Sequence, residues 1–186
     1  LIERISDLVL RLEGDVSVDV SGIEEDSRLL RPGQVFVARA GERSDGRRFV
    51  GQAIDAGAAA ILSDAAPVPE GRGVPWIQVR DVRRAAALLA WGFHQEPGER
   101  AKVDFVTGTN GKTSWTWLAE AMLKEAAIAV GVIGTVERRW GDTVESADMT
   151  TPDAPRLHAL LGRMANDGVE RVVMELSSHA IAQDRW

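Results

Sequence analysis

The fold of this 186-residue chain is decided by one stretch, Lys102-Val103-Asp104-Phe105-Val106-Thr107-Gly108-Thr109-Asn110-Gly111-Lys112-Thr113. Its apolar first half predicts a buried strand, and its two glycines predict a loop. After this loop, apolar side chains recur at helical spacing, at Trp115, Leu118, Ala119, Met122, Leu123 and Ala126. We therefore predict a helix that begins at Lys112 and has one apolar face.

The order strand, glycine loop, Gly-Lys-Thr and helix is typical of a phosphate-binding loop. Glycines let backbone N–H groups point toward an anion, and the helix N-terminus adds a partial positive charge. Lys112 would then reach the terminal phosphates of a nucleotide, and the Thr113 hydroxyl would hold Mg²⁺. The strict Walker pattern has a glycine where this chain has Val106, so the loop is a compact variant. The alternative interpretation is a Gly-Asn-Gly turn followed by a surface lysine.

Composition excludes several classes of protein. The net charge is −6 and no run of lysine and arginine occurs, so we expect no nucleic-acid partner. The absence of cysteine excludes a disulfide framework and a thiolate zinc site. No apolar span is long enough to cross a membrane, and the acidic start of the chain does not resemble a signal peptide.

The first half of the chain alternates predicted strands and helices. We predict helices over residues 1–12, 47–56 and 81–93, the last capped by Asp81, and strands over 16–20, 35–38, 58–62 and 76–79. The polar segment 95–100, which contains Pro97 and Gly98, resembles a boundary between domains. The predicted fold class is therefore α/β, with a small N-terminal α/β domain over 1–97. The first part of a mostly parallel P-loop domain follows over 98–186.

The second half continues the alternation. We predict a strand over 128–133, a hairpin of 135–140 and 143–147 around Gly141-Asp142, and a strand over 171–176. Thr151-Pro152-Asp153 predicts the start of a helix, with Thr151 as its cap. We expect His94 to lie on the surface and His158 to be structural.

Polar residues gather after the last predicted strand, where Glu175 is followed by Ser177, Ser178 and His179. In open α/β sheets, ligands bind outside the carboxyl ends of the strands. A carboxylate there can hold the Mg²⁺ that bridges nucleotide phosphates, so Glu175 is a candidate metal ligand. A Ser-His hydrolytic pair is the alternative, although neighbours in sequence seldom place a base correctly on a nucleophile.

Four ordered motifs resemble those of Mur ligases, and the similarity covers nearly the whole chain. The first motif comprises Asp26-Ser27-Arg28, Pro32-Gly33, Val35-Phe36-Val37-Ala38, Gly41, Asp45-Gly46, Phe49, Ala53 and Gly57-Ala58. The others are the loop 107–113, Met149-Thr150-Thr151-Pro152-Asp153, and Met174-Glu175-Leu176-Ser177-Ser178-His179-Ala180 with Gln183 and Arg185. The last two motifs narrow the resemblance to the MurE type.

The resemblance implies an ATP-dependent peptide ligase of peptidoglycan precursor synthesis, acting in the cytoplasm with ATP and Mg²⁺. ATP would phosphorylate the D-Glu carboxylate of UDP-MurNAc-L-Ala-D-Glu, and the amine of a diamino acid would displace the phosphate. The chain is then expected to be an N-terminal part of the enzyme and inactive alone, and a monomer is favoured for the enzyme. It should expose a sheet edge and an apolar face.

The resemblance also implies roles for individual residues. Lys112, Glu175 and His179 would be catalytic, and Thr113 and Glu175 would lie near the metal. ATP would contact Gly108, Thr109, Asn110, Gly111, Lys112, Thr113 and Ser114. The UDP-sugar peptide would contact Glu25, Ser27, Glu42, Arg43, Ser44, Thr150, Thr151, Ser177, Gln183 and Arg185. The segment Glu42-Arg43-Ser44 departs from the His-Gln-Ala that is frequent in the family.

Other functions fit the residues less well. A MurF-like ligase acting on UDP-MurNAc-tripeptide shares the first two motifs, whereas folylpolyglutamate and cyanophycin ligases would not explain Asp26-Ser27-Arg28 and Pro32-Gly33. A P-loop kinase or GTPase would leave the N-terminal domain unexplained, and no Asn-Lys-x-Asp motif occurs. A non-catalytic nucleotide-binding module remains a hypothesis.

Overall fold

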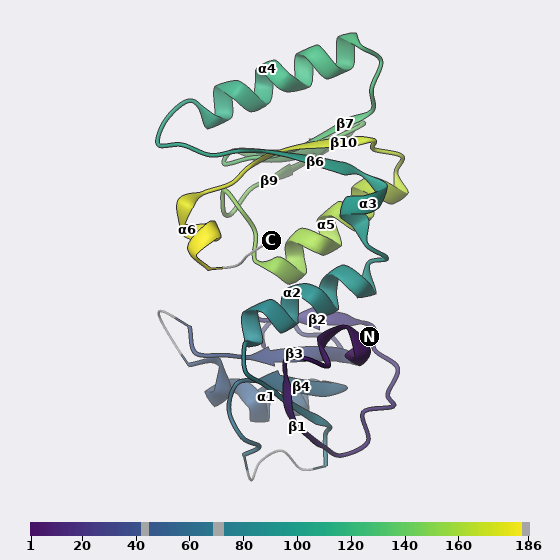
Figure 1. Cartoon of the computed structure of the whole chain (residues 1–186), viewed down its shortest axis with the longest axis vertical. Helices are drawn as coiled ribbons and strands as arrows, with labels where there is room; N and C mark the ends of the chain where they lie inside the picture. Colours follow the sequence, from purple (N-terminus) through teal and green to yellow (C-terminus); the bar gives the residue numbers. More distant parts are fainter. Residues whose placement is uncertain (42–44, 69–72, 184–186) are drawn as a thin grey trace. The chain divides into compact units, whose positions relative to one another are not determined.

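A computed structural model describes residues 1–41, 45–68 and 73–183 (Figure 1). The chain divides between Phe93 and His94 into two compact units. Both units contain a sheet with helices, so the predicted α/β class is confirmed. No helix within the described residues is long and apolar enough to span a membrane.

The first unit has a five-stranded sheet in the order β1-β5-β4-β3-β2. Strands β2 to β5 are parallel, and β1 pairs antiparallel with β5. The elements are η1 (Ile2–Ile5), β1 (Val9–Glu13), β2 (Gly22–Glu24), β3 (Gln34–Ala38), η2 (Gly46–Phe49), α1 (Val50–Asp55), β4 (Ala60–Ser63), β5 (Trp76–Val79) and α2 (Val82–Phe93).

Both faces of this sheet are buried, as the nearly continuous apolar sequence of its central strands indicates. Val35 and Val37 of β3 pack with α2 on one face, while Phe36 packs with α1 on the other. The predicted cap of α2 is confirmed, because Asp81 accepts the N–H of Arg84 at 3.0 Å.

Two predictions for the first unit were wrong. The expected helix over 1–12 is a short 3₁₀ turn followed by β1, where Leu12 lies opposite Ile77 of β5. The expected strand over 16–20 has no strand partner, although Val16 and Val20 pack on the core. In the first segment, pairing with β5 overrides the local helical pattern. In the second, the alternating pattern alone does not produce a strand.

The second unit has a five-stranded sheet in the order β6-β10-β7-β8-β9, in which β6, β10 and β7 are parallel and β8 and β9 form the predicted hairpin. Helix α4 covers one face and α5 the other (Figure 1). The elements are α3 (Pro97–Arg100), β6 (Lys102–Val106), α4 (Lys112–Glu125), β7 (Val130–Ile133), β8 (Glu137–Trp140), β9 (Thr143–Ser146), α5 (Ala154–Asn166), β10 (Arg171–Glu175) and α6 (Ser178–Ala182).

Helix α4 begins at Lys112 as predicted, but its apolar face is only partly buried. Its buried residues are Thr116 and Glu120, whereas Leu118 and Met122 are exposed. Glu120 is buried because it forms an ion pair with Arg139 of β8. The Arg139 guanidinium also lies 3.6 Å from the Trp117 ring centre. Burial alone would raise the pKa of Glu120, but hydrogen bonds from Arg139 and Lys124 lower it on balance.

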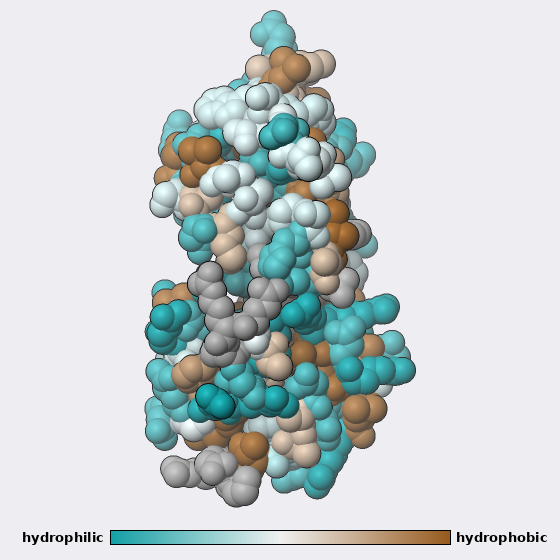
Figure 2. All heavy atoms as spheres, turned by 90° about the vertical axis from the view of Figure 1, so that its left-hand side faces the viewer, coloured by the Kyte–Doolittle hydropathy of each residue, from teal (hydrophilic) through white to brown (hydrophobic). Residues whose placement is uncertain are grey.

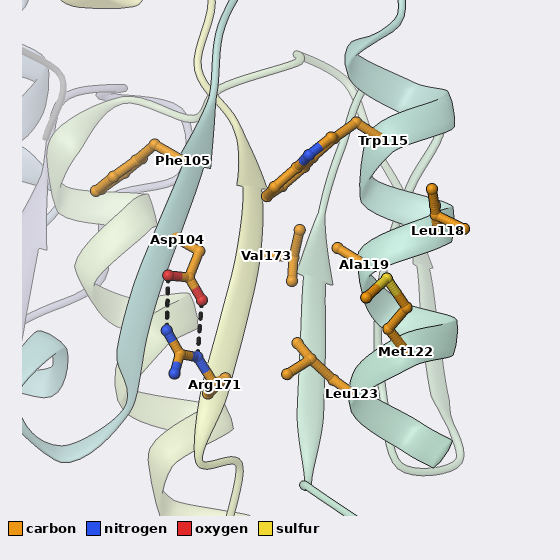
Figure 3. Close-up of a pocket in the computed structure, with 9 residues that line it drawn as sticks. All are labelled: Asp104, Phe105, Trp115, Leu118, Ala119, Met122, Leu123, Arg171 and Val173. Carbon is orange, nitrogen blue, oxygen red and sulfur yellow. Dashed lines mark hydrogen bonds and ion pairs between the residues drawn. The ribbon is translucent and has the colours of Figure 1, made fainter. Parts of the chain in front are cut away.

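An apolar groove of about 450 Å³ lies between α4 and the strands β6 and β10. Figure 3 shows Trp115 and Leu123 reaching from α4 toward Val173, with Leu118 on the far side of the helix. Among the described residues, β6 is an edge strand of its sheet, and its Phe105 is exposed. The expected open edge and apolar face are therefore present. Figure 2 shows another side of the protein, on which hydrophobic side chains are interspersed with hydrophilic ones.

Candidate functional site

The glycine loop joins β6 to α4 and has the backbone of an anion site. Gly108 and Gly111 have φ angles of +143° and +82°, which residues with a side chain rarely adopt. Within the described part of the chain, the N–H groups of residues 108 to 113 donate no hydrogen bond. Free N–H groups at the N-terminus of a 14-residue helix suit a phosphate. Lys112 lies over this loop, with Nζ 2.7 Å from the carbonyl oxygen of Gly108.

Glu175 lies beside the point where this loop begins. Its strand β10 pairs in parallel with β6, so that Glu175 is level with Val106, and the N–H of Leu176 donates to the Val106 carbonyl at 2.8 Å. The loop and the carboxylate thus share the carboxyl edge of the sheet, as predicted.

The Glu175 side chain is buried, with the residue only 1% exposed. Its Oε1 accepts the N–H of Thr135 at 3.1 Å, and its Oε2 accepts the Thr135 hydroxyl at 2.9 Å. No cationic side chain among the described residues pairs with it. A buried carboxylate held only by neutral donors favours an added cation, because an uncompensated buried charge is costly.

These donors fit Mg²⁺. The carboxylate keeps lone pairs beyond the two that Thr135 uses. Thr113, in the first turn of α4 after the glycine loop, would offer a second hard oxygen donor. The described residues contain no group of three or more His, Cys, Asp or Glu side chains that could cage a metal. Mg²⁺ is commonly bound through one or two carboxylates with phosphate oxygens and waters, so a full protein cage is not needed.

Thr151 does not cap α5, which corrects the prediction. The cap is Asp153, whose Oδ1 accepts the N–H of Arg156 at 3.1 Å. Thr151 is instead buried next to the site, where its hydroxyl donates to the Glu175 carbonyl at 2.9 Å and accepts the Ser177 N–H at 3.1 Å. It therefore holds together the two ends of the segment that leaves β10.

Other predicted site residues lie around this edge. Thr150 is 3.1 Å from the Thr135 hydroxyl, and Ser177 caps α6 by accepting the N–H of Ala180 at 3.1 Å. His179 is exposed on α6, and Gln183 is half-buried just after it. Arg185 lies outside the described residues.

The predicted uridine-side residues belong to the first unit. Glu25 accepts hydrogen bonds from Arg39 at 2.7 and 2.8 Å, and Ser27 donates to Gln52 at 3.0 Å. Both follow β2, so the structure places them on one loop. Glu42, Arg43 and Ser44 lie outside the described residues.

The two histidines outside the motifs differ from each other. His158, which we expected to be structural, is buried, and burial lowers its pKa to about 4, with a further contribution from His94. The expected surface position of His94 was wrong, because it is half-buried against Gly162 of α5, and this burial lowers its pKa.

Sequence reasoning missed Gly134 and Thr135 as site residues. A Cβ at Gly134 would lie 2.8 Å from Oε1 of Glu175, so the carboxylate occupies the space that the glycine leaves. The available signal was their position directly after β7, at the same carboxyl edge as Glu175.

Comparison with known proteins shows the family of the chain. The model of the Mur ligase middle domain matches residues 106–186, and a second model, described as Mur ligase family, catalytic domain, matches residues 19–94. The chain belongs to the Mur ligase family.

Curated relatives of this Mur ligase chain are named UDP-N-acetylmuramoyl-L-alanyl-D-glutamate–2,6-diaminopimelate ligase. One from Caldanaerobacter subterraneus subsp. tengcongensis is 37% identical over 100% of this chain and 38% of its own length. Another, from Chlorobium phaeobacteroides, is 41% identical over 100% of this chain and 36% of its own length. The chain thus spans less than two fifths of the relatives it matches.

Solved structures give the same family. A ligase of that name has a TM-score of 0.73 and 26% identity, covering 89% of this chain and 34% of the solved chain. A MurF ligase from Thermotoga maritima in complex with ADP has a TM-score of 0.56 and 25% identity, covering 88% and 34%.

Proposed function

We propose that this chain supplies the UDP-sugar-binding and nucleotide-binding parts of an ATP-dependent ligase. The ligase adds a diamino acid to UDP-MurNAc-L-Ala-D-Glu in peptidoglycan precursor synthesis. Residues 1–97 form the UDP-sugar domain, and residues 98–186 begin the ATP domain. The observation that carries the proposal is the buried Glu175 carboxylate beside the unpaired N–H groups of the glycine loop.

A carboxylate is a poor electrophile, so the reaction needs a leaving group on the D-Glu side chain. ATP supplies it by phosphorylating that carboxylate, and the incoming amine then expels phosphate and forms the amide. The loop from Gly108 to Ser114 binds the phosphates, with Lys112 offsetting the charge that develops during transfer. Glu175 and Thr113 would hold Mg²⁺, which would offset negative charge on the phosphoryl oxygens.

The substrate side is assigned to polar groups around this edge and in the first unit. Thr150, Thr151, Ser177, Gln183 and Arg185 hold the muramoyl-peptide, and Glu25, Ser27 and the segment 42–44 hold the UDP end. His179 is exposed near the start of α6 and is proposed to face the reacting groups. We further propose that the enzyme acts in the cytoplasm as a monomer.

The test is ADP release by the full-length protein. With UDP-MurNAc-L-Ala-D-Glu present, we expect release to require a diamino acid, either 2,6-diaminopimelate or L-lysine, and to yield the UDP-linked tripeptide by mass spectrometry. ADP release that is equal with unrelated amines would contradict a peptide ligase of this kind. Activity restricted to UDP-MurNAc-tripeptide as acceptor would instead support a MurF-like ligase.

A further inference from the structure

We propose that Thr135 is a positioning residue that links Thr150, on the substrate side, to Glu175, on the metal side. This inference rests on the proposed function for the identity of the metal and the substrate. Its basis is the hydrogen-bond chain at the carboxyl edge of the second sheet, from Thr150 through Thr135 to the carboxylate.

Thr135 holds both oxygens of the carboxylate. Its N–H binds Oε1 at 3.1 Å, and its hydroxyl binds Oε2 at 2.9 Å. Two donors from one residue fix the plane of the carboxylate as well as its position. The backbone of Thr135 is itself placed by the turn into β8, where the Gly134 N–H donates to the Glu137 carbonyl at 3.1 Å.

The direction of the hydroxyl hydrogens follows from the acceptor. An ionised carboxylate only accepts hydrogen bonds, so the Thr135 hydroxyl donates to Glu175. The contact of 3.1 Å between the Thr135 and Thr150 hydroxyls then requires Thr150 to donate to Thr135. Each bond polarises the next, so the group that faces Thr150 affects the carboxylate.

The carboxylate also packs closely against Gly134, the residue before Thr135. The space at Gly134 is filled by Oε1, which would lie 2.8 Å from an added Cβ. The carboxylate is therefore held closely against Gly134 and Thr135, and the lone pairs that Thr135 does not use stay available to a metal. A substrate that changes the hydrogen bond of Thr150 would alter metal binding at Glu175, and the metal would alter substrate binding equally.

The experiment measures Mn²⁺ binding to the full-length protein with ADP, by electron paramagnetic resonance. Thr135→Val keeps the branched shape and the N–H but removes the hydroxyl. We expect it to weaken Mn²⁺ binding roughly 10-fold or more, the range for partners of metal ligands. Thr135→Ser should restore binding to near the unsubstituted value, and ADP affinity in EDTA should not change in either variant.

The matched control is Thr143→Val, at a half-buried threonine of β9 outside the site, which should bind Mn²⁺ normally. Thr150→Val should weaken Mn²⁺ binding when Thr135 is present and have no further effect in Thr135→Val. Equal Mn²⁺ binding by Thr135→Val and the unsubstituted protein overturns the inference. So does failure of Thr135→Ser to restore it. Normal Mn²⁺·ADP binding without ligase activity in the unsubstituted protein contradicts the proposed function alone.

Discussion

Lys112 lies over the glycine loop, with its ammonium 2.7 Å from the Gly108 carbonyl oxygen. A phosphate in the loop would offer this ammonium a charged acceptor in place of a neutral one, and charge-assisted hydrogen bonds are about twice as strong. The side chain is thus held close to the place where the proposed reaction develops negative charge.

Replacement of Lys112 should therefore reduce catalysis more than it reduces folding. We expect Lys112→Met in the full-length protein to lower kcat for ADP release by about 10²- to 10³-fold, as for loss of one transition-state donor. The control is Lys102→Met, at an exposed lysine at the start of the same strand β6. Similar losses in both variants would count against a role for Lys112 in phosphoryl transfer.

His158 links stability to pH. Burial holds its pKa at about 4, below the ordinary value of 6.5, and its Nδ1 has no hydrogen-bond partner among the described residues. The unfolded chain therefore binds a proton that the folded chain does not between these values. The neutral His158 ring makes its full contribution to the free energy of unfolding above about pH 6.5. This contribution is lost as the pH falls toward 4, by at most about 3 kcal/mol.

His158→Leu should flatten this dependence. Unfolding by urea at pH 7 and at pH 4.5 would give the two free energies of unfolding, and the variant should lose less stability between them than the unsubstituted protein. An equal loss in both proteins would show that other groups cause the acid sensitivity.

At the scale of elements, two residues at the start of α5 have different roles, since Asp153 caps the helix and Thr151 helps to form the site. Asp153 supplies the cap, so Asp153→Ala should lower the free energy of unfolding by about 1 kcal/mol and leave Mn²⁺·ADP binding unchanged. Thr151→Val removes a buried hydroxyl that bridges Glu175 and Ser177, and it should reduce both quantities. A larger stability loss in Asp153→Ala, together with weaker metal binding, would contradict this division of roles.

At the scale of the whole molecule, exposed apolar side chains and an open strand edge predict self-association through α4 and β6. Leu118 and Met122 of α4 are 62% and 66% exposed, and β6 is an edge strand of the sheet that this helix covers. Adjacent apolar surface and unpaired strand edges favour self-association. The bidentate pair of Asp104 and Arg171, at 2.8 Å, places charges at the groove without closing it (Figure 3).

We therefore expect the 186-residue chain to form concentration-dependent oligomers, detectable by light scattering after size-exclusion chromatography. The double variant Leu118→Glu, Met122→Lys should shift the chain toward monomer. Leu29→Lys, at an exposed leucine of the first unit, is the control and should not. A chain that is monomeric at all concentrations would contradict the prediction.

The sequence alone determined the features that depend on local order. The strand and glycine loop that lead to Lys112 could be predicted because they are contiguous. So could the position of Glu175 at the carboxyl edge, because consecutive parallel strands must end at the same side of their sheet.

Only the tertiary structure decided which partners those residues meet. The N-terminal segment became β1 by pairing with β5, and α4 buried Glu120 because Arg139 of another strand reaches it. The Thr135 hydroxyl donates a hydrogen bond to a carboxylate 40 residues away in the sequence. No hydrophobic periodicity of the local sequence predicts such a contact. Hydrophobic periodicity reports which face of an element is apolar. It carries no information about the polar groups that distant strands bring to the same edge, and these groups form the site.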